Sequence, residues 1–208
     1  MSGTLQNRFG LQEAHRHMAN ILAFAGSTRS NSFNFLLLRA AVASAKHAGA
    51  EVTMIDLGDY SMPLFDQDLE AAEGMPENAQ RLKQLMIEHE GLLVASPEYN
   101  SSISPLLKNT VDWVSRSASA DEPALAAYRN KFAAIMSASP GGLGGLRGLV
   151  VLRMLLTNIG VTVLPQQLAV GHAHSAFDDD GTLRDVTQQD ILNSMTERLV
   201  SVIDAINR

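Results

Sequence analysis

Short apolar runs alternate with longer amphipathic segments along most of the chain, and this alternation predicts strands and helices in turn. The apolar runs predict buried strands at 21–25, 52–57, 92–95, 132–137 and 161–164. The longer segments, often followed by glycine, predict helices at 35–47, 78–90, 146–158 and 190–206, and Ser104-Pro105 opens another because serine caps helices and proline suits their first position. Strands that are apolar on both faces are typical of a parallel sheet covered by helices.

The predicted order is therefore β-α repeated five times, which indicates a doubly wound α/β fold. Five parallel strands fit a flavodoxin-like sheet of order 2-1-3-4-5, with helices on both faces, better than a six-stranded dinucleotide fold. We expect residues 19–208 to form this domain and residues 1–18 to be a flexible N-terminal tail. Two long connections, 59–76 and 117–130, are candidates for lids or subunit contacts.

Composition narrows the classes of function. A net charge of −6 and only 5% aromatic residues disfavour nucleic acid as a partner. The absence of cysteine excludes thiol chemistry, so any redox chemistry must reside in a bound group. The chain has no apolar run of about 20 residues, which argues against a membrane span. The polar start of the chain does not resemble a signal peptide, and we expect a cytoplasmic protein.

Ligands of such sheets bind beyond the carboxyl ends of the strands, so the loops there are the ones to inspect. The loop after the first strand, 26–34, offers serine hydroxyls, Arg29 and a helix N-terminus, which together suit a phosphate. The loop after the third strand, 96–102, places the flat Tyr99 among polar groups. The loop after the fourth, 137–145, has four glycines, whose backbone can approach a ligand closely. A mononucleotide with a large heterocycle fits all three loops, and FMN is the natural candidate.

Three motifs resemble those of the NAD(P)H-dependent FMN reductase family, in the same order. They are G-S-T-R-S-N-S-F-N at 26–34, P-E-Y-N at 97–100 followed by L-K-N-T-V-D-W at 107–113, and the glycine-rich loop. The resemblance implies that the first motif holds the FMN phosphate, the second contacts the ribityl chain and ring, and the third borders the pyrimidine side of the ring. The implied cofactor-binding residues are Ser27, Arg29, Ser32, Phe33, Asn34, Pro97, Glu98, Tyr99, Asn100, Ser101, Ser139, Gly141, Gly142 and Gly144.

The resemblance also implies a reaction. NADPH or NADH would reduce the FMN at N5, and a small-molecule acceptor would then be reduced in its place, by a ping-pong mechanism. The acceptor would be a quinone, an azo compound, a metal oxyanion or free flavin. No residue is assigned as catalytic, because the cofactor carries the chemistry. Relatives of this kind assemble as homodimers or homotetramers with the flavin near a subunit contact.

Other interpretations stay open. A flavodoxin-type electron carrier would bind FMN without reacting with NAD(P)H, and a regulatory oligomer would have lost catalysis. A phosphate-handling hydrolase has less support, because no metal carboxylate cluster or positioned nucleophile is evident. Arg147 either meets a nicotinamide nucleotide phosphate or bridges subunits. No metal site is predicted: His172-x-His174 has no clear third ligand, and residues 176–187 fail the register of a calcium loop.

Overall fold

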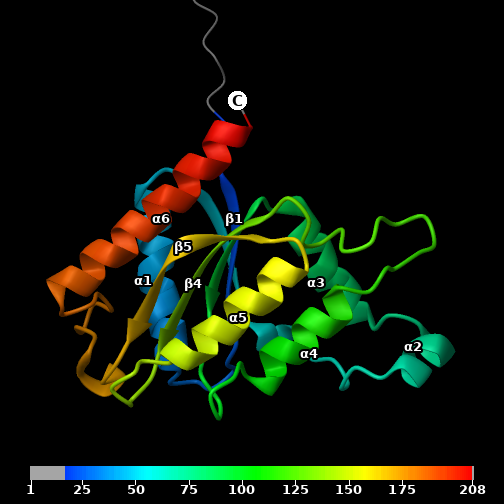
Figure 1. Cartoon of the computed structure of the whole chain (residues 1–208), viewed down its shortest axis with the longest axis horizontal. Helices are drawn as coiled ribbons and strands as arrows, with labels where there is room; N and C mark the ends of the chain where they lie inside the picture. The colour runs from blue at the N-terminus through cyan, green and yellow to red at the C-terminus, as the bar shows by residue number, and fades with distance from the viewer. Residues whose placement is uncertain (1–16, 208) are drawn as a thin grey trace, which may run out of the picture.

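The computed structural model describes residues 17–207, which are built around one five-stranded parallel sheet (Figure 1). Its spatial order is β2-β1-β3-β4-β5. The strands are β1 (Asn20–Ala25), β2 (Glu51–Ile55), β3 (Gly91–Ala95), β4 (Phe132–Ala138) and β5 (Thr162–Val170). The predicted α/β class and strand order are confirmed.

Helices cover both faces of the sheet (Figure 1). The helices α1 (Phe33–His47) and α6 (Val186–Ile206) pack on one face, with a core that includes Leu37, Leu38 and Leu199. The helices α3 (Glu77–Glu88), α4 (Pro105–Val114) and α5 (Leu146–Asn158) pack on the other, around Leu92 and Leu152. Both cores exist because the three inner strands are buried on both of their faces.

Strand register brings three loops to one edge of the sheet. Ala25, the last residue of β1, pairs with Ala95, the last residue of β3. Ala95 in turn pairs with Met136, near the end of β4. The loops that leave β1, β3 and β4 therefore start side by side at the carboxyl edge.

Two predicted strands differ from the structure by more than one residue at an end. β5 continues to Val170 rather than ending at Leu164, and it passes through Pro165 and two glutamines. An edge strand tolerates proline because one side of its backbone needs no partner in the sheet. Leu57, predicted to close the second strand, instead begins the short 3₁₀ helix η1 (Leu57–Tyr60), which Asp56 caps with a hydrogen bond from the Gly58 N–H.

The first long connection contains a short helix that the sequence pattern did not predict, α2 (Gln67–Glu73). It stands out from the body of the molecule (Figure 1), and none of its residues is buried. The segment before it is held by the second motif. The Asn109 amide and the Trp113 indole N–H both donate to the Pro63 carbonyl, at 2.9 and 2.8 Å. Asn109 and Trp113 of that motif therefore anchor the segment before α2 to α4.

The predicted N-terminal tail lies outside the described residues, apart from His17 and Met18. The His17 ring lies 2.8 Å from the Glu90 carboxylate at the amino edge of the sheet. Between residues 17 and 207, we find no helix that combines the length and apolarity needed to cross a bilayer.

Candidate functional site

The three loops at the carboxyl edge enclose a cavity of about 310 Å³. Residues from all three loops line it: Ser27, Arg29, Ser32, Phe33, Asn34, Pro97, Glu98, Tyr99, Ala138, Ser139 and Pro140. Nine of these are among the predicted site residues, since only Ala138 and Pro140 were not expected. Five predicted residues lie outside the lining of this cavity: Asn100, Ser101, Gly141, Gly142 and Gly144.

The first loop presents the groups that bind an anion. Ser32 caps α1, with its hydroxyl oxygen accepting from the Phe35 N–H at 3.4 Å, and the start of the helix, Ser32 to Asn34, lines the cavity. The Arg29 guanidinium is exposed and lies 5.3 Å from the centroid of the Phe33 ring. Among the ion pairs of residues 17–207, none uses Arg29, so its charge is available to a phosphate.

Asn34, which lines the cavity, also connects two of the loops. Its amide group donates to the Ala138 carbonyl at 2.9 Å and accepts from the Ala138 N–H at 3.0 Å. Asn34 is buried, and both of its polar atoms are used in this pair of bonds. The side chain therefore joins the start of α1 to the end of β4, and it fixes the first and third loops relative to each other.

The second loop forms a tight turn that displays Tyr99. The backbone of Tyr99 pairs with that of Ser102 in both directions, and the intervening Asn100 and Ser101 have φ values of 52° and 66°. Their left-handed conformations close the turn. Tyr99 is 52% exposed at the mouth of the cavity, where its flat face is suited to a planar ligand.

Glu98, in the same loop, faces the helix α5. Its carboxylate accepts from Arg147 Nε at 2.8 Å and from the Gly148 N–H at 3.0 Å. Burial alone would raise the pKa of Glu98, but the Gly148 N–H and the Arg147 charge outweigh it and lower that pKa below its ordinary value. The ionised carboxylate therefore contributes stability that is present above the pKa of the unfolded chain and is lost as the pH falls through the lowered folded pKa.

The third loop needs its glycines for two different reasons. Gly144 and Gly145 have φ values of 60° and 88°, and a Cβ on Gly144 would lie 2.6 Å from the Val170 carbonyl carbon. A Cβ on Gly145 would overlap the Ser137 hydroxyl. Gly141 and Gly142 have more space, since a Cβ would meet nothing closer than 3.6 Å. The first pair shapes the turn, whereas the second pair leaves its backbone open to a ligand.

These three surfaces fit FMN. The serine hydroxyls, the helix N-terminus and the unpaired Arg29 would hold the phosphate. Tyr99 would lie beside the ring, and the backbone N–H of Gly142 would be available to its polar edge, whereas that of Gly141 donates to the Ser139 hydroxyl at 3.2 Å. In the described range 17–207, no three His, Asp or Glu side chains lie close enough together to hold a metal ion.

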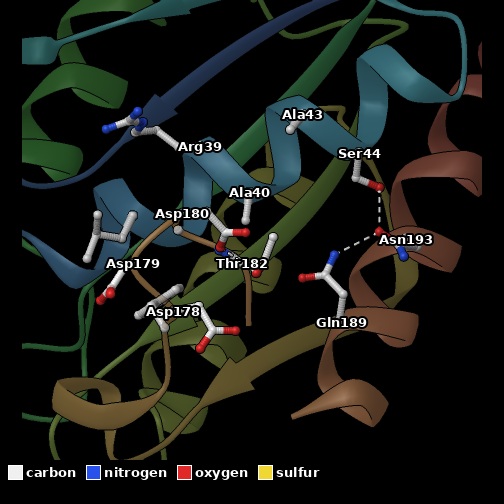
Figure 2. A pocket seen from close by; sticks show the side chains of 13 residues that line it. Arg39, Ala40, Ala43, Ser44, Asp178, Asp179, Asp180, Thr182, Gln189 and Asn193 are labelled. Carbon is white, nitrogen blue, oxygen red and sulfur yellow. Dashed lines mark hydrogen bonds between the residues drawn. The ribbon is translucent and has the colours of Figure 1, made fainter. Parts of the chain in front are cut away.

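A second cavity, of about 370 Å³, lies along the middle of α1 and suits this ligand poorly (Figure 2). It is bordered by α1, α6 and the loop that carries Asp178, Asp179 and Asp180. Figure 2 shows Ser44 bonded to Asn193, which in turn accepts from Gln189, so part of the polar lining is already paired. Three carboxylates line this cavity against one guanidinium, that of Arg39, so their net negative charge disfavours a phosphate and the cavity at the strand ends remains the candidate flavin site.

Comparison with known proteins agrees with this geometry. The sequence pattern of a family described as NADPH-dependent FMN reductase matches residues 19–175. The chain belongs to the NADPH-dependent FMN reductase family. An NAD(P)H-dependent FMN reductase of Pseudomonas aeruginosa is 31% identical over 180 residues, which cover 86% of this chain and 92% of that protein. An NADPH:quinone oxidoreductase of Arabidopsis thaliana is 37% identical over 144 residues, 68% of each chain.

A solved structure supports the fold of the family. The flavoenzyme NAD(P)H:acceptor oxidoreductase from Paracoccus denitrificans superposes with a TM-score of 0.76 and 24% identity, over 90% of this chain and 98% of that one. Membership of the FMN reductase family confirms the predicted class of protein, an oxidoreductase with FMN as cofactor and NAD(P)H as electron donor.

Two contacts could not be foreseen from the family motifs. Arg147 was expected to meet either a nicotinamide nucleotide or another subunit, but it pairs with Glu98 of its own chain. Asn34 reaches across 104 residues to Ala138. Both contacts join segments that are distant in sequence, α5 to the loop after β3 and α1 to the end of β4, and no local pattern specifies them.

Proposed function

We propose that this member of the FMN reductase family passes electrons from NAD(P)H to small-molecule acceptors by a ping-pong mechanism. Quinones, azo compounds, metal oxyanions and free flavin are the candidate acceptors. Bound FMN would supply the chemistry by accepting a hydride at N5 and giving it up again. The observation that carries the proposal is that all three predicted loops border one cavity, with Arg29, which forms no ion pair within residues 17–207, in its lining and an exposed tyrosine at its mouth.

The residues of the chain would bind and orient. Arg29 and Ser32 would fix the phosphate, and Tyr99 would lie against the plane of the ring. Because a single open cavity serves the site, donor and acceptor would occupy the same place in turn. Initial rates measured at several NADPH and quinone concentrations test this: parallel double-reciprocal lines are expected, whereas intersecting lines would require both substrates to be bound together.

Removal of the Arg29 guanidinium should weaken FMN binding. We expect Arg29→Ala to raise the Kd for FMN about tenfold, since a charged hydrogen bond to an exposed phosphate lies near the lower end of about 1.5–3 kcal/mol. Titration of apoprotein with FMN measures this, and the spectrum of the flavin that still binds should be unchanged. Arg39→Ala is the matched control, because Arg39 lines the second cavity rather than the flavin site. Equal affinity in the two variants would exclude the assigned role of Arg29.

We also propose that the protein is a homo-oligomer in which a second copy covers the outer face of α5. Leu146, Val150 and Met154 form an exposed stripe on this helix, beside an apolar groove of about 370 Å³ between α4 and α5. Their spacing of four residues places all three on one face. An antiparallel copy with Val150 near a two-fold axis would set Leu146 against Met154 in each direction.

Charge favours the same arrangement. The two cations of this part of α5 are already engaged: Arg147 with Glu98, and Arg153 with the carbonyls of Val163 and Leu164 on β5. Both guanidinium groups are therefore bonded within their own chain, and the stripe of Leu146, Val150 and Met154 itself carries no charged side chain. The stripe begins beside the glycine loop, so the partner would also lie next to the flavin site.

A cytoplasmic location stays a prediction.

A charge on the stripe should dissociate the oligomer. We expect Val150→Glu to shift the protein to monomers, because the buried carboxylate would lack a partner in the interface. Val150 is 62% exposed, so the change should leave the fold of the chain intact. Sedimentation velocity measures the state, and Val186→Glu, at a 72% exposed valine of α6, is the control that should remain assembled. An unchanged sedimentation coefficient for Val150→Glu would place the interface elsewhere.

A further inference from the structure

The Glu98 carboxylate is buried against the start of α5 although it belongs to the loop after β3. Its side chain is only 8% exposed, whereas that of its partner Arg147 is 60% exposed. One oxygen accepts from the Arg147 guanidinium and the other from the Gly148 N–H. Both carboxylate oxygens are therefore bonded to α5, although Glu98 also borders the flavin cavity.

The helix α5 lacks a cap of its own. Its N-cap is Gly145, which has a left-handed backbone and no side chain to accept from the first N–H groups. Helix N-termini leave four N–H groups without partners, and a carboxylate there also interacts favourably with the helix dipole. Glu98 supplies this missing acceptor from another loop.

The close approach depends on a second glycine. A Cβ on Gly148 would lie 3.2 Å from the Glu98 Cβ and 3.2 Å from the Ser102 carbonyl oxygen. The absence of that Cβ lets the first turn of α5 pack directly on the loop that carries Tyr99. The segment that leads into α5 is the glycine loop, so this contact connects two of the three surfaces of the site.

We propose that Glu98 is a positioning residue: it caps α5 and thereby fixes the glycine loop relative to the Tyr99 loop. The inference rests on the proposed flavin site. Glu98 would act on FMN through the placement of these two loops and not as a ligand of the ring. Arg147 would contribute less, because its exposed charge is screened by water, whereas the bond to Gly148 is partly buried.

The apoprotein offers a test of the cap that needs no cofactor. Hydrogen exchange of the Gly148 amide should be about tenfold faster or more in Glu98→Ala than in the wild type, since a charged hydrogen bond is lost. In Glu98→Gln the amide oxygen can still accept, and exchange should stay within about threefold of the wild type. Glu73→Ala, on the exposed α2, is the control and should leave the Gly148 amide unaffected.

The affinity for FMN and the spectrum of the bound flavin test the positioning role. Glu98→Ala should raise the Kd for FMN about tenfold and shift the visible spectrum of the bound flavin, because the two loops no longer hold a fixed separation. Glu98→Gln should restore both, and Arg147→Ala should change the Kd by no more than about threefold. A purely structural role would lower the unfolding temperature of Glu98→Ala without changing the flavin spectrum.

Three results would overturn the inference. If the Gly148 amide exchanges equally fast in wild type and Glu98→Ala, the carboxylate does not cap α5. If exchange accelerates but FMN affinity and spectrum do not change, the cap does not position the site. If Glu98→Gln binds FMN as poorly as Glu98→Ala, the charge itself meets the ligand. A wild-type protein that fails to bind FMN would instead contradict the proposed function, and the exchange comparison in apoprotein would still decide the cap.

Discussion

Gly145→Ala is expected to destabilise the protein by about 3 kcal/mol. Gly145 has a φ of 88°, a region that costs alanine about 1–2 kcal/mol. Its new Cβ would overlap the Ser137 hydroxyl and lie 2.8 Å from the Ser137 Cβ, and Ser137 is fully buried. Relief of that overlap adds about 1–3 kcal/mol. Urea unfolding of the two proteins measures the difference.

Gly141→Ala is the matched control in the same loop. Its Cβ would meet only the Ser139 hydroxyl at 3.7 Å, and its backbone is not left-handed, so stability should change by less than about 1 kcal/mol. Equal stability of the two variants would mean that the turn at Gly145 is not as rigid as its contacts indicate.

Asn34→Ala is the second change with a large expected effect. It would remove both partners of the Ala138 backbone groups, which are bonded to the Asn34 amide at 2.9 and 3.0 Å. Each buried backbone group left without a partner costs about 1–3 kcal/mol, so we expect a loss of about 2–4 kcal/mol in the free energy of unfolding. FMN affinity should fall as well, because the first and third loops lose their connection.

Asn31→Ala is the matched control, because it removes an exposed asparagine from the same loop. Asn31 is exposed, so its replacement should change the free energy of unfolding by no more than about 0.5 kcal/mol. If Asn34→Ala were as stable as Asn31→Ala but bound FMN far less tightly, Asn34 would act on the ligand directly, as the family motif first suggested.

The sheet could be predicted from the sequence because its inner strands are local apolar runs between glycines and helices. The helix α5 lies at 146–158, where the pattern predicts it, and Ser104 caps α4 with Pro105 as its first residue. These features depend on residues that are neighbours in the chain, and local preferences are enough to specify them.

The edges of the sheet were harder to predict for a physical reason. Residues 165–167 of β5 are proline and two glutamines, which an outer strand accepts because water or a side chain can satisfy its free edge. The helix α2 is only seven residues long and has no buried residue, so the sequence shows no repeating hydrophobic face that would predict it.

The sequence predicted which loops border the candidate site, but it did not predict the hydrogen-bond partners of their side chains. Ser27, Arg29, Ser32 and Tyr99 lie in one cavity, as their positions after neighbouring strands predict. Asn34 and Glu98 of the family motifs also border this cavity. The Asn34 amide, however, bonds to the Ala138 backbone, and the Glu98 carboxylate bonds to α5. A motif gives the position of such a residue, whereas its hydrogen-bond partner depends on how distant segments pack.

Anaerobic reduction of the FMN-loaded protein tests the central claim most directly. The protein is mixed with one equivalent of FMN and then with NADPH or NADH under nitrogen, while the visible flavin band is recorded. We expect the flavin band to bleach at least as fast as the enzyme turns over in the steady state, and to return when a quinone is added. A band that persists while FMN remains bound would contradict the reductase function and would favour an electron carrier of the flavodoxin type.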